Sequence, residues 1–272
     1  MPRPILPHPP ATASRRPSLL PPPRPVAGAH VYSALMNLHE ALAGAMRDAA
    51  GARRFVEEFA AHHSGPITPG DGYDEAEVSA TEDRLGFALP AALREAYIHY
   101  GRRDDLVACQ DYLLAPGELK PDRTGTVLVF RSENQSVTHW GVPLARIGEP
   151  DPPVVYHDDT VGWRPWMDRL SSACMEMVLS EWILGGDRDA PGRADNRTLT
   201  EEAVAVLEAR AQRLPLPGYP QWAAPDDPPV RWFTMPGTVL RDDGTTWLWA
   251  RTETKKQLRQ LRRLLPGDWL LS

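Results

Sequence analysis

The apolar positions of the first part of the chain repeat with the period of a helix. They lie three or four residues apart, which places them on one helix face: Leu35, Leu38, Leu42, Met46 and Ala49. A second apolar stripe runs from Phe55 to about His63. Gly51 lies between the two stripes and is expected to interrupt the helix. The pattern therefore predicts a helical segment over residues 31–65.

Glycine and proline then divide the chain into shorter elements. Five of these residues between positions 65 and 72 predict a linker. A short helix follows over about 74–85, with Gly86 in the position of a C-terminal cap. Pro90 suits the first turn of the next helix, which ends at Gly101. Both glycines are expected to adopt the positive φ that ends a helix.

Beyond Gly101 the apolar pattern changes to that of strands. Short runs rich in β-branched and aromatic residues predict strands over 126–130, 136–142 and 154–157. The polar residues 131–135 have the length of a turn between the first two strands. A helical stripe then predicts a helix over 170–184.

The last part of the chain alternates between the two patterns. It predicts a helix over 200–214, strands over 231–240 and 246–250, and a final helix over 253–265 with a basic face. Asp242-Asp243-Gly244 is a good hairpin turn between the two strands. The fold class expected from all these elements is α+β, with a mixed, mainly antiparallel sheet flanked by helices. A helical N-terminal addition and a C-terminal hairpin-helix complete it.

Proline singles out the beginning of the chain. Runs at positions 9–10 and 21–23 prevent helix and sheet, which predicts a disordered or extended tail. A second interpretation stays open, in which translation starts at Met36. The resulting division is a proline-rich tail over 1–30, a helical segment over 31–65, a core over 66–186 and an extension over 187–272 that packs on the core.

Charge is unevenly distributed along the chain. The net charge is -6, but residues 1–28 contribute +4 and residues 251–263 contribute +5, so the remaining residues carry -15. Such an acidic body repels nucleic acid and attracts basic partners. We expect no direct nucleic-acid contact, and no membrane contact because no stretch approaches about 20 apolar residues. Two cysteines and a proline-interrupted N-terminus predict a cytoplasmic protein.

The sequence offers little catalytic chemistry. His157, Asp158 and Asp159, together with Glu149 and Asp151, could hold a metal, but their spacing does not fit a calcium loop and three prolines stiffen the stretch. There is no nucleophile elbow and no phosphate-binding glycine loop. We therefore predict no catalytic residue, no metal and no cofactor, and nothing in the sequence sets an oligomeric state.

Five short motifs occur in a fixed order along the chain. The first motif is Glu82-x-x-Leu85-Gly86-x-x-Leu89-Pro90-x-x-Leu93-x-x-x-Tyr97-x-x-x-Gly101. The others are Glu133-Asn134-Gln135, Trp140-Gly141-Val142, Asp151-Pro152-Pro153-Val154, and an aromatic residue at Trp163 or Trp166. In this order the motifs resemble the SUKH superfamily, which contains Smi/Knr-type cell-wall-assembly regulators and bacterial immunity proteins. The resemblance covers residues 74–185, and most of these positions would serve the scaffold.

The resemblance implies a non-enzymatic binding protein. Bacterial members are similar to immunity proteins that bind a cognate polymorphic toxin, often a nuclease, so the expected partner is a basic protein. A regulatory scaffold and an enzyme are the alternatives. The expected contact residues are Glu133, Asn134, Gln135, Asp151, Asp158, Asp159, Trp163 and Trp166. For the first three an alternative stays open, in which they only bond their own turn.

Overall fold

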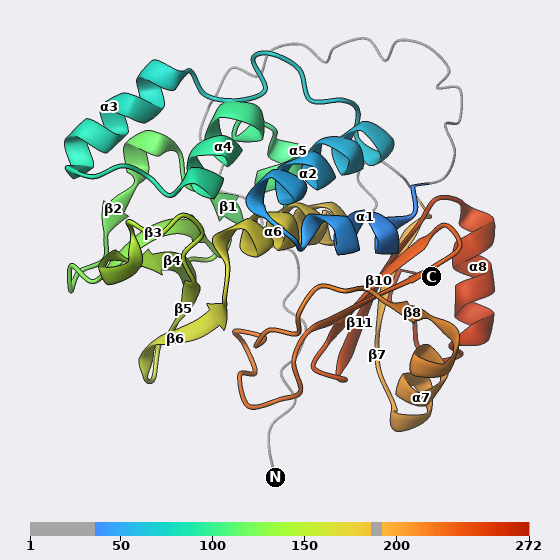
Figure 1. Ribbon diagram of the computed structural model, residues 1–272. Coiled ribbons are helices and arrows are strands. Elements are labelled where there is room, and N and C mark those ends of the chain that lie inside the picture. The colour runs from blue at the N-terminus through green and yellow to red at the C-terminus, as the bar shows by residue number, and fades with distance from the viewer. Residues whose placement is uncertain (1–35, 186–191, 272) are drawn as a thin grey trace. The chain divides into compact units, whose positions relative to one another are not determined.

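The computed structural model describes residues 36–185 and 192–271, which fall within one compact unit (Figure 1). The tail predicted over 1–30 lies outside the described residues. The described chain begins with five helices: α1 (Leu38–Ala45), α2 (Ala49–His63), α3 (Glu75–Leu85), α4 (Ala91–Tyr100) and α5 (Asp104–Val107).

The first sheet follows these helices. Its strands are β1 (Tyr112–Leu113), β2 (Lys120–Pro121), β3 (Val127–Ser132), β4 (His139–Pro143), β5 (Val154–Asp158) and β6 (Gly162–Met167). The order is β1-β3-β4-β5-β6, and β2 also pairs with β3. Short 3-10 turns lie at Pro116–Glu118 and Leu144–Arg146, and helix α6 (Leu170–Leu184) leaves the sheet after β6.

A second sheet forms from the last part of the chain. Its strands are β7 (Ala194–Thr198), β8 (Gln212–Arg213), β9 (Arg231–Met235), β10 (Thr238–Asp243) and β11 (Trp247–Thr252), in the order β7-β11-β10-β9-β8. The accompanying helices are α7 (Glu201–Arg210) and α8 (Lys255–Leu264). The α+β class is confirmed. Every strand pairing in the described chain is antiparallel, and there are two sheets where one was expected.

Helix α6 lies between the two sheets (Figure 1). Every residue from Leu170 to Ile183 is buried, which is typical of a helix that is apolar on most sides. It packs against α2, α4 and α5 and against strand β11 of the second sheet. Among the described residues, none of the helices has the length and apolarity needed to cross a bilayer.

The second sheet has apolar residues on both faces. Along β9 and β10 successive side chains alternate between the faces. Trp232 and Val239 belong to the main core together with α1, α2, α4 and α6. Phe233 and Leu240 belong to a smaller core with α7 and α8. The second sheet is therefore covered on one side by the main core and on the other by its own two helices.

Three helix ends test the glycine predictions. The helix break lies at Asp48, whose carboxylate caps α2 by accepting the Gly51 N–H at 2.6 Å, so the expected interruption at Gly51 is wrong. Gly86 ends α3 with φ 79°, as predicted. Gly101 has φ -63°, so the positive φ predicted there is wrong. Glycine is needed at this position because a Cβ would lie 2.9 Å from the Cα of Tyr97.

The C-terminal hairpin differs from the prediction. The single strand expected at its start is two strands, β9 and β10, joined by a turn at Gly237 with φ 64°. Asp242 and Asp243 were expected in the second turn but lie buried at the end of β10. Their carboxylates pair with Arg231 and Arg241, respectively. An arginine partner is what makes a buried aspartate tolerable in a strand.

Candidate functional site

Two hairpin turns lie next to each other at one end of the first sheet. In the register of β4 and β5, Trp140 is opposite Tyr156, which brings the β3–β4 turn beside the β5–β6 turn. The hydroxyl of Thr138 donates to the carbonyl of His157 at 2.6 Å and ties the two turns together. We call this region the hairpin-tip surface and define it by Gln135, Val137, His139, His157, Asp159 and Val161.

The hairpin-tip surface combines apolar, acidic and titratable groups. Val137 is 44% exposed and Val161 is 67% exposed. The Nδ1 of His157 lies 3.4 Å from a carboxylate oxygen of the exposed Asp159. Partial burial, together with the nearby His157, holds the pKa of His139 below its usual value. Exposed apolar side chains beside a charge are a common arrangement at protein-binding surfaces.

The expected contact residues between 133 and 135 divide by burial. Glu133 is buried, and its carboxylate accepts the N–H groups of Gln135 at 2.8 Å and Val137 at 3.2 Å. This is the turn bonding that the sequence left open as the alternative. Asn134 is half-buried, whereas Gln135 is exposed. Of the three, Gln135 alone is exposed to solvent.

The acidic turn after β5 is also partly structural. The carboxylate of Asp158 accepts the N–H and hydroxyl of Thr160 and pairs with Arg164. Asp159 has no such role in the turn and its side chain is 71% exposed. Trp163 is half-buried, with its ring edge against His157. Asp158, Asp159 and Trp163 therefore lie at the end of the sheet that carries the hairpin tips.

Asp151 and Trp166 lie away from the hairpin tips. Asp151 precedes β5 at the opposite end of the sheet, where its carboxylate accepts the N–H and hydroxyl of Ser171 in the first turn of α6. Trp166 is buried, with ring centroids 5.7 Å from Trp140 and 5.2 Å from Tyr219. The expected contact residues thus occupy three different places in the fold.

A second candidate site is a partly open cavity of about 170 Å³. It lies where β3, β4, α6, β10 and β11 meet, so residues far apart in the sequence line it. Its buried wall includes Asp111, Arg131, Trp140, Glu176, Arg241 and Asp243. Half-buried residues line the rest, including Leu184, Gln221 and Trp222. Charged side chains therefore line the inner part of the cavity, and apolar and amide side chains line its edge.

Arg131 is the centre of the charges in this cavity. Its guanidinium donates to Glu176 at 3.0 Å, to Glu181 at 2.8 Å and to Asp111 at 3.1 Å. The two glutamates come from α6, so these bonds attach the first sheet to that helix. The prediction that Arg131 lies in a turn is wrong, because β3 continues to Ser132.

Arg241 forms the matching centre in the second sheet. Its guanidinium donates to Asp243 at 2.7 Å and to the Ser180 hydroxyl at 2.8 Å. That hydroxyl bonds Glu176, which also accepts the Tyr219 hydroxyl at 2.8 Å. One continuous polar network therefore joins both sheets through α6.

The sequence carries a signal for this network, although none of its residues was predicted as a site. Glu176, Ser180 and Glu181 interrupt the apolar stripe of the helix predicted over 170–184. Charged residues are almost never fully buried without partners. Two glutamates in a helix that is otherwise apolar therefore predict arginine or lysine partners from other elements, although not which ones.

The pKa of Asp111 connects this network with the pH dependence of the protein's stability. Burial, helped by the neighbouring Glu181, raises its pKa to about 7 against the opposing effect of Arg131. Because the folded pKa exceeds the ordinary value of 3.8, the folded state binds this proton more tightly than the unfolded state. The stabilisation is fully present below pH 3.8 and is lost as the pH rises to about 7.

We predict that Asp111→Asn flattens the pH dependence of the melting temperature between pH 5 and pH 8. An amide carries no charge, so the variant does not lose stability through ionisation at this position. At pH 8 its melting temperature should therefore be higher relative to that of the wild type than at pH 5. Thermal unfolding followed by circular dichroism measures this. Asp159→Asn removes an exposed carboxylate and should keep the wild-type slope. An unchanged slope in the Asp111 variant would contradict the prediction.

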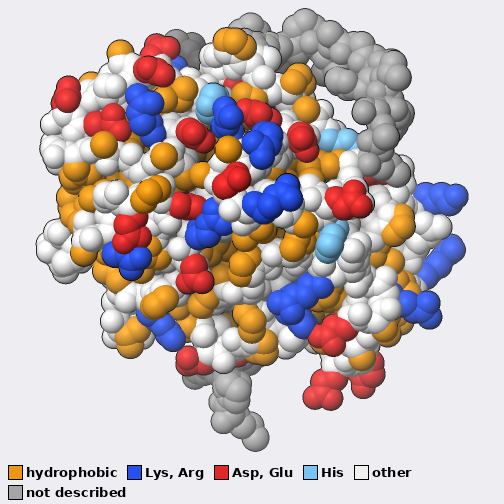
Figure 2. Space-filling view, viewed as in Figure 1, with side chains coloured by type: hydrophobic (Ala, Val, Ile, Leu, Met, Phe, Trp, Pro, Cys, Tyr) orange, Lys and Arg blue, Asp and Glu red, His pale blue; other side chains and the backbone are white. Residues whose placement is uncertain are grey.

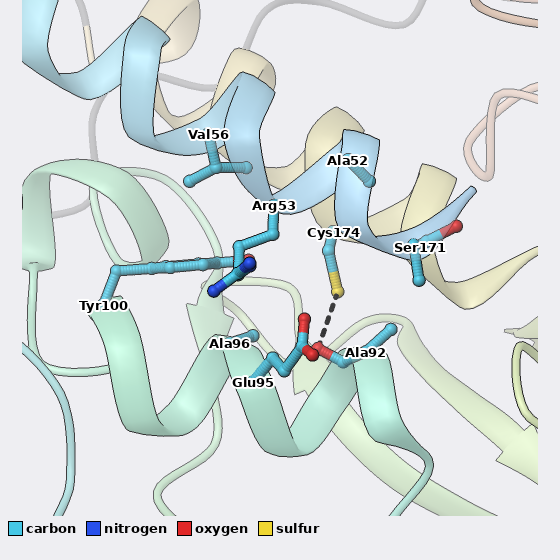
Figure 3. A pocket seen from close by; sticks show the side chains of 10 residues that line it. Ala52, Arg53, Val56, Ala92, Glu95, Ala96, Tyr100, Ser171 and Cys174 are labelled. Carbon is cyan, nitrogen blue, oxygen red and sulfur yellow. Dashed lines mark hydrogen bonds between the residues drawn. The ribbon is translucent and has the colours of Figure 1, made fainter. Parts of the chain in front are cut away.

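A much smaller cavity, of about 20 Å³, lies between α2, α4 and α6 (Figure 3). Ala52, Val56, Ala96 and the buried Cys174 line it, and the Cys174 thiol lies 4.0 Å from the carbonyl of Ala92. Burial raises the pKa of this thiol to about 12. The space holds about one water molecule. A thiol that stays protonated is a poor nucleophile, so this cavity is a packing defect and not a reactive site.

Helix α8 has the amphipathic character that the sequence predicts. Leu258 and Leu261 are buried against the second sheet. The exposed basic residues are Lys255, Lys256, Arg259 and Arg263. On the face shown in Figure 2, basic side chains project at the edge where α8 lies, and elsewhere acidic and basic side chains are interspersed.

Within residues 36–185 and 192–271, no three side chains of His, Cys, Asp or Glu come together in a way that could hold a metal ion. No family model matches the chain, and the comparisons with curated proteins and with solved structures also found no match. The resemblance to the SUKH superfamily therefore stays a prediction from the sequence motifs.

Proposed function

We propose that this protein captures a basic protein toxin through its hairpin-tip surface and has no enzymatic activity of its own. The observation that carries the proposal is the pair of adjacent turns with two exposed valines, Val137 and Val161, next to the exposed Asp159. The toxin as partner, and the role of an immunity protein, come from the resemblance of the sequence motifs to SUKH proteins.

The turns are held in one conformation by their own hydrogen bonds. Glu133 accepts two backbone N–H groups of the first turn, and Asp158 accepts the N–H and hydroxyl of Thr160 in the second. A surface that is already ordered loses less conformational entropy when a partner binds. This favours the hairpin tips as a contact surface, even though the two carboxylates themselves are used inside the turns.

Charge supports a basic partner. Outside residues 1–28 and 251–263 the chain carries a net charge of -15. A net negative field speeds the approach of a positively charged protein and slows that of nucleic acid. Asp159 is the acidic residue at the hairpin tips with the most accessible side chain. A change of its charge should therefore have the largest effect on the affinity for a basic partner.

The test uses the toxic products of neighbouring genes as candidate partners. Co-expression is expected to restore growth for one of them, and the purified pair should form a stable complex. Asp159→Arg is expected to weaken this complex at least about tenfold, because it replaces an attraction with a repulsion at the contact. Calorimetric titration at low and at moderate salt measures the change.

Asp83→Arg is the matched control, because it makes the same change of net charge at an exposed position of α3. It should leave the affinity within about twofold, since long-range steering alone mostly changes the association rate. Equal effects of the two variants would place the contact elsewhere. If no neighbouring gene product is toxic and several non-toxic proteins bind, the regulatory scaffold is the better account.

A further inference from the structure

The partly open cavity of about 170 Å³ holds more acidic than basic groups. Two guanidiniums, of Arg131 and Arg241, face five carboxylates, a formal surplus of three negative charges: Asp111, Glu133, Glu176, Glu181 and Asp243. Glu181 reaches the cavity only through its bond to Arg131, and the other four line it. Buried charge that lacks a counter-charge is unfavourable. A cation that enters the cavity would offset part of this surplus.

Several polar atoms in the wall of the cavity lack a partner. The bonds that the described residues make to the carboxylates of Asp111 and Glu133 use one oxygen of each, so Asp111 Oδ1 and Glu133 Oε1 stay open to a further donor. No acceptor in the described part of the chain reaches the buried Nε of Arg131 or the buried Nε1 of Trp140, and both residues are only 2% exposed. Most buried polar groups in native structures are paired. The wall thus offers acceptors to a cation and donors to an oxygen.

Four tryptophans also line the cavity: Trp140, Trp166, Trp222 and Trp249. Aromatic faces attract ammonium and guanidinium groups, most strongly where water is excluded. Such a contact already exists in the wall, where the guanidinium carbon of Arg131 lies 4.7 Å from the centroid of the Trp140 ring. Acidic groups and tryptophans together favour an organic cation over a metal ion or an anion.

The volume limits the size of the ligand. An apolar cavity of about 150 Å³ admits benzene, so the 170 Å³ here suits a molecule of similar size. We infer that this cavity binds a small organic cation, an ammonium compound that also carries an oxygen acceptor. Its positive group would face Asp111 and Glu133, and its oxygen would take the place of the missing acceptor for Arg131 or Trp140. No residue that defines the hairpin-tip surface lines the cavity, although Glu133 lines it and also bonds the β3–β4 turn. The inference does not depend on the proposed function.

The probes are choline and ethanolamine, each an ammonium compound with a hydroxyl group. Calorimetric titration into the full chain at pH 8 is expected to show saturable binding of at least one of them. A change of tryptophan fluorescence should accompany it, because four tryptophans line the cavity. The neutral carbon analogue of choline, 3,3-dimethyl-1-butanol, has the same shape without the charge and is expected not to bind.

Two variants test the two kinds of group in the site, the carboxylates and the aromatic rings. Asp111→Asn removes one of the surplus charges and is expected to weaken binding about tenfold or more, as for a lost charge-assisted hydrogen bond. Trp222→Ala removes an aromatic wall at a half-buried position outside any helix or strand, and should weaken binding with little effect on folding. Trp163→Ala is its control, since Trp163 is also half-buried but does not line the cavity.

The inference is overturned if neither ammonium compound binds, which would mean that the cavity holds only water. It is also overturned if the neutral analogue binds equally well, or if Trp163→Ala weakens binding as much as Trp222→Ala. Circular dichroism of each variant confirms that the fold is kept. Toxin capture is measured separately, so either proposal can fail while the other stands.

Discussion

Arg131→Met is expected to lower the free energy of unfolding by about 3–5 kcal/mol. The guanidinium is 2% exposed and donates to Glu176, Glu181 and Asp111, so its loss leaves three buried carboxylates without their main counter-charge. Total stabilities of about 5–15 kcal/mol are typical, so much of the variant should be unfolded at moderate urea. Urea denaturation followed by tryptophan fluorescence measures the change in midpoint.

The matched control is Arg146→Met, which breaks an ion pair with Glu149 at the surface. It should not shift the midpoint, because exposed ion pairs contribute little. Combining Arg131→Met with Glu176→Gln and Glu181→Gln should recover part of the lost stability, since the unpaired charges are then removed as well. A small effect of the single change, or no recovery in the triple variant, would contradict the account of the network.

Gly72→Ala is expected to destabilise the protein by about 3 kcal/mol, at the upper end for overpacking. A Cβ at this position would lie 1.7 Å from the carbonyl oxygen of Ile98 and 2.8 Å from that of Tyr97. Both carbonyls belong to the last turn of α4, and Tyr73 donates its N–H to the Tyr97 carbonyl at 2.8 Å. The segment can make room only by giving up this bond or by distorting the helix end.

Gly117→Ala provides the comparison, because a Cβ there would meet no atom within 4 Å. Its effect should stay within about 0.5 kcal/mol, as for most surface substitutions. The melting temperatures of the two variants, measured by thermal unfolding in the same buffer, test this difference. Similar melting temperatures for both would show that the close approach of residue 72 to α4 relaxes easily.

Elements whose signals are local can be predicted from the sequence alone. Helix α3 begins with a capping box of Asp74 and Glu77 and ends at Gly86, and all three residues lie within the helix or next to it. Helix α8 follows from the spacing of its leucines and from the cap at Thr254. Capping and periodicity depend on neighbours three or four residues away, and for that reason the sequence contains the whole signal.

The hairpin-tip surface was only partly predictable. The residues of the β3–β4 turn and of the β5–β6 turn are polar in the sequence. The sequence does not show, however, that the two turns lie at the same end of the sheet. That follows from the register that places Trp140 opposite Tyr156. The same register puts Asp151 at the other end, where it caps α6 through Ser171 and has a structural role.

The positions of the buried charges depend on contacts between distant parts of the chain. The bonds of Arg131 to Asp111, Glu176 and Glu181 span 20 to 50 residues of sequence. In sequence a charged side chain reads as solvent-exposed or as part of a turn, and Arg131 and Asp243 were placed in turns on that basis. Whether such a group is buried depends on a partner that compensates its desolvation, and packing of distant elements supplies that partner.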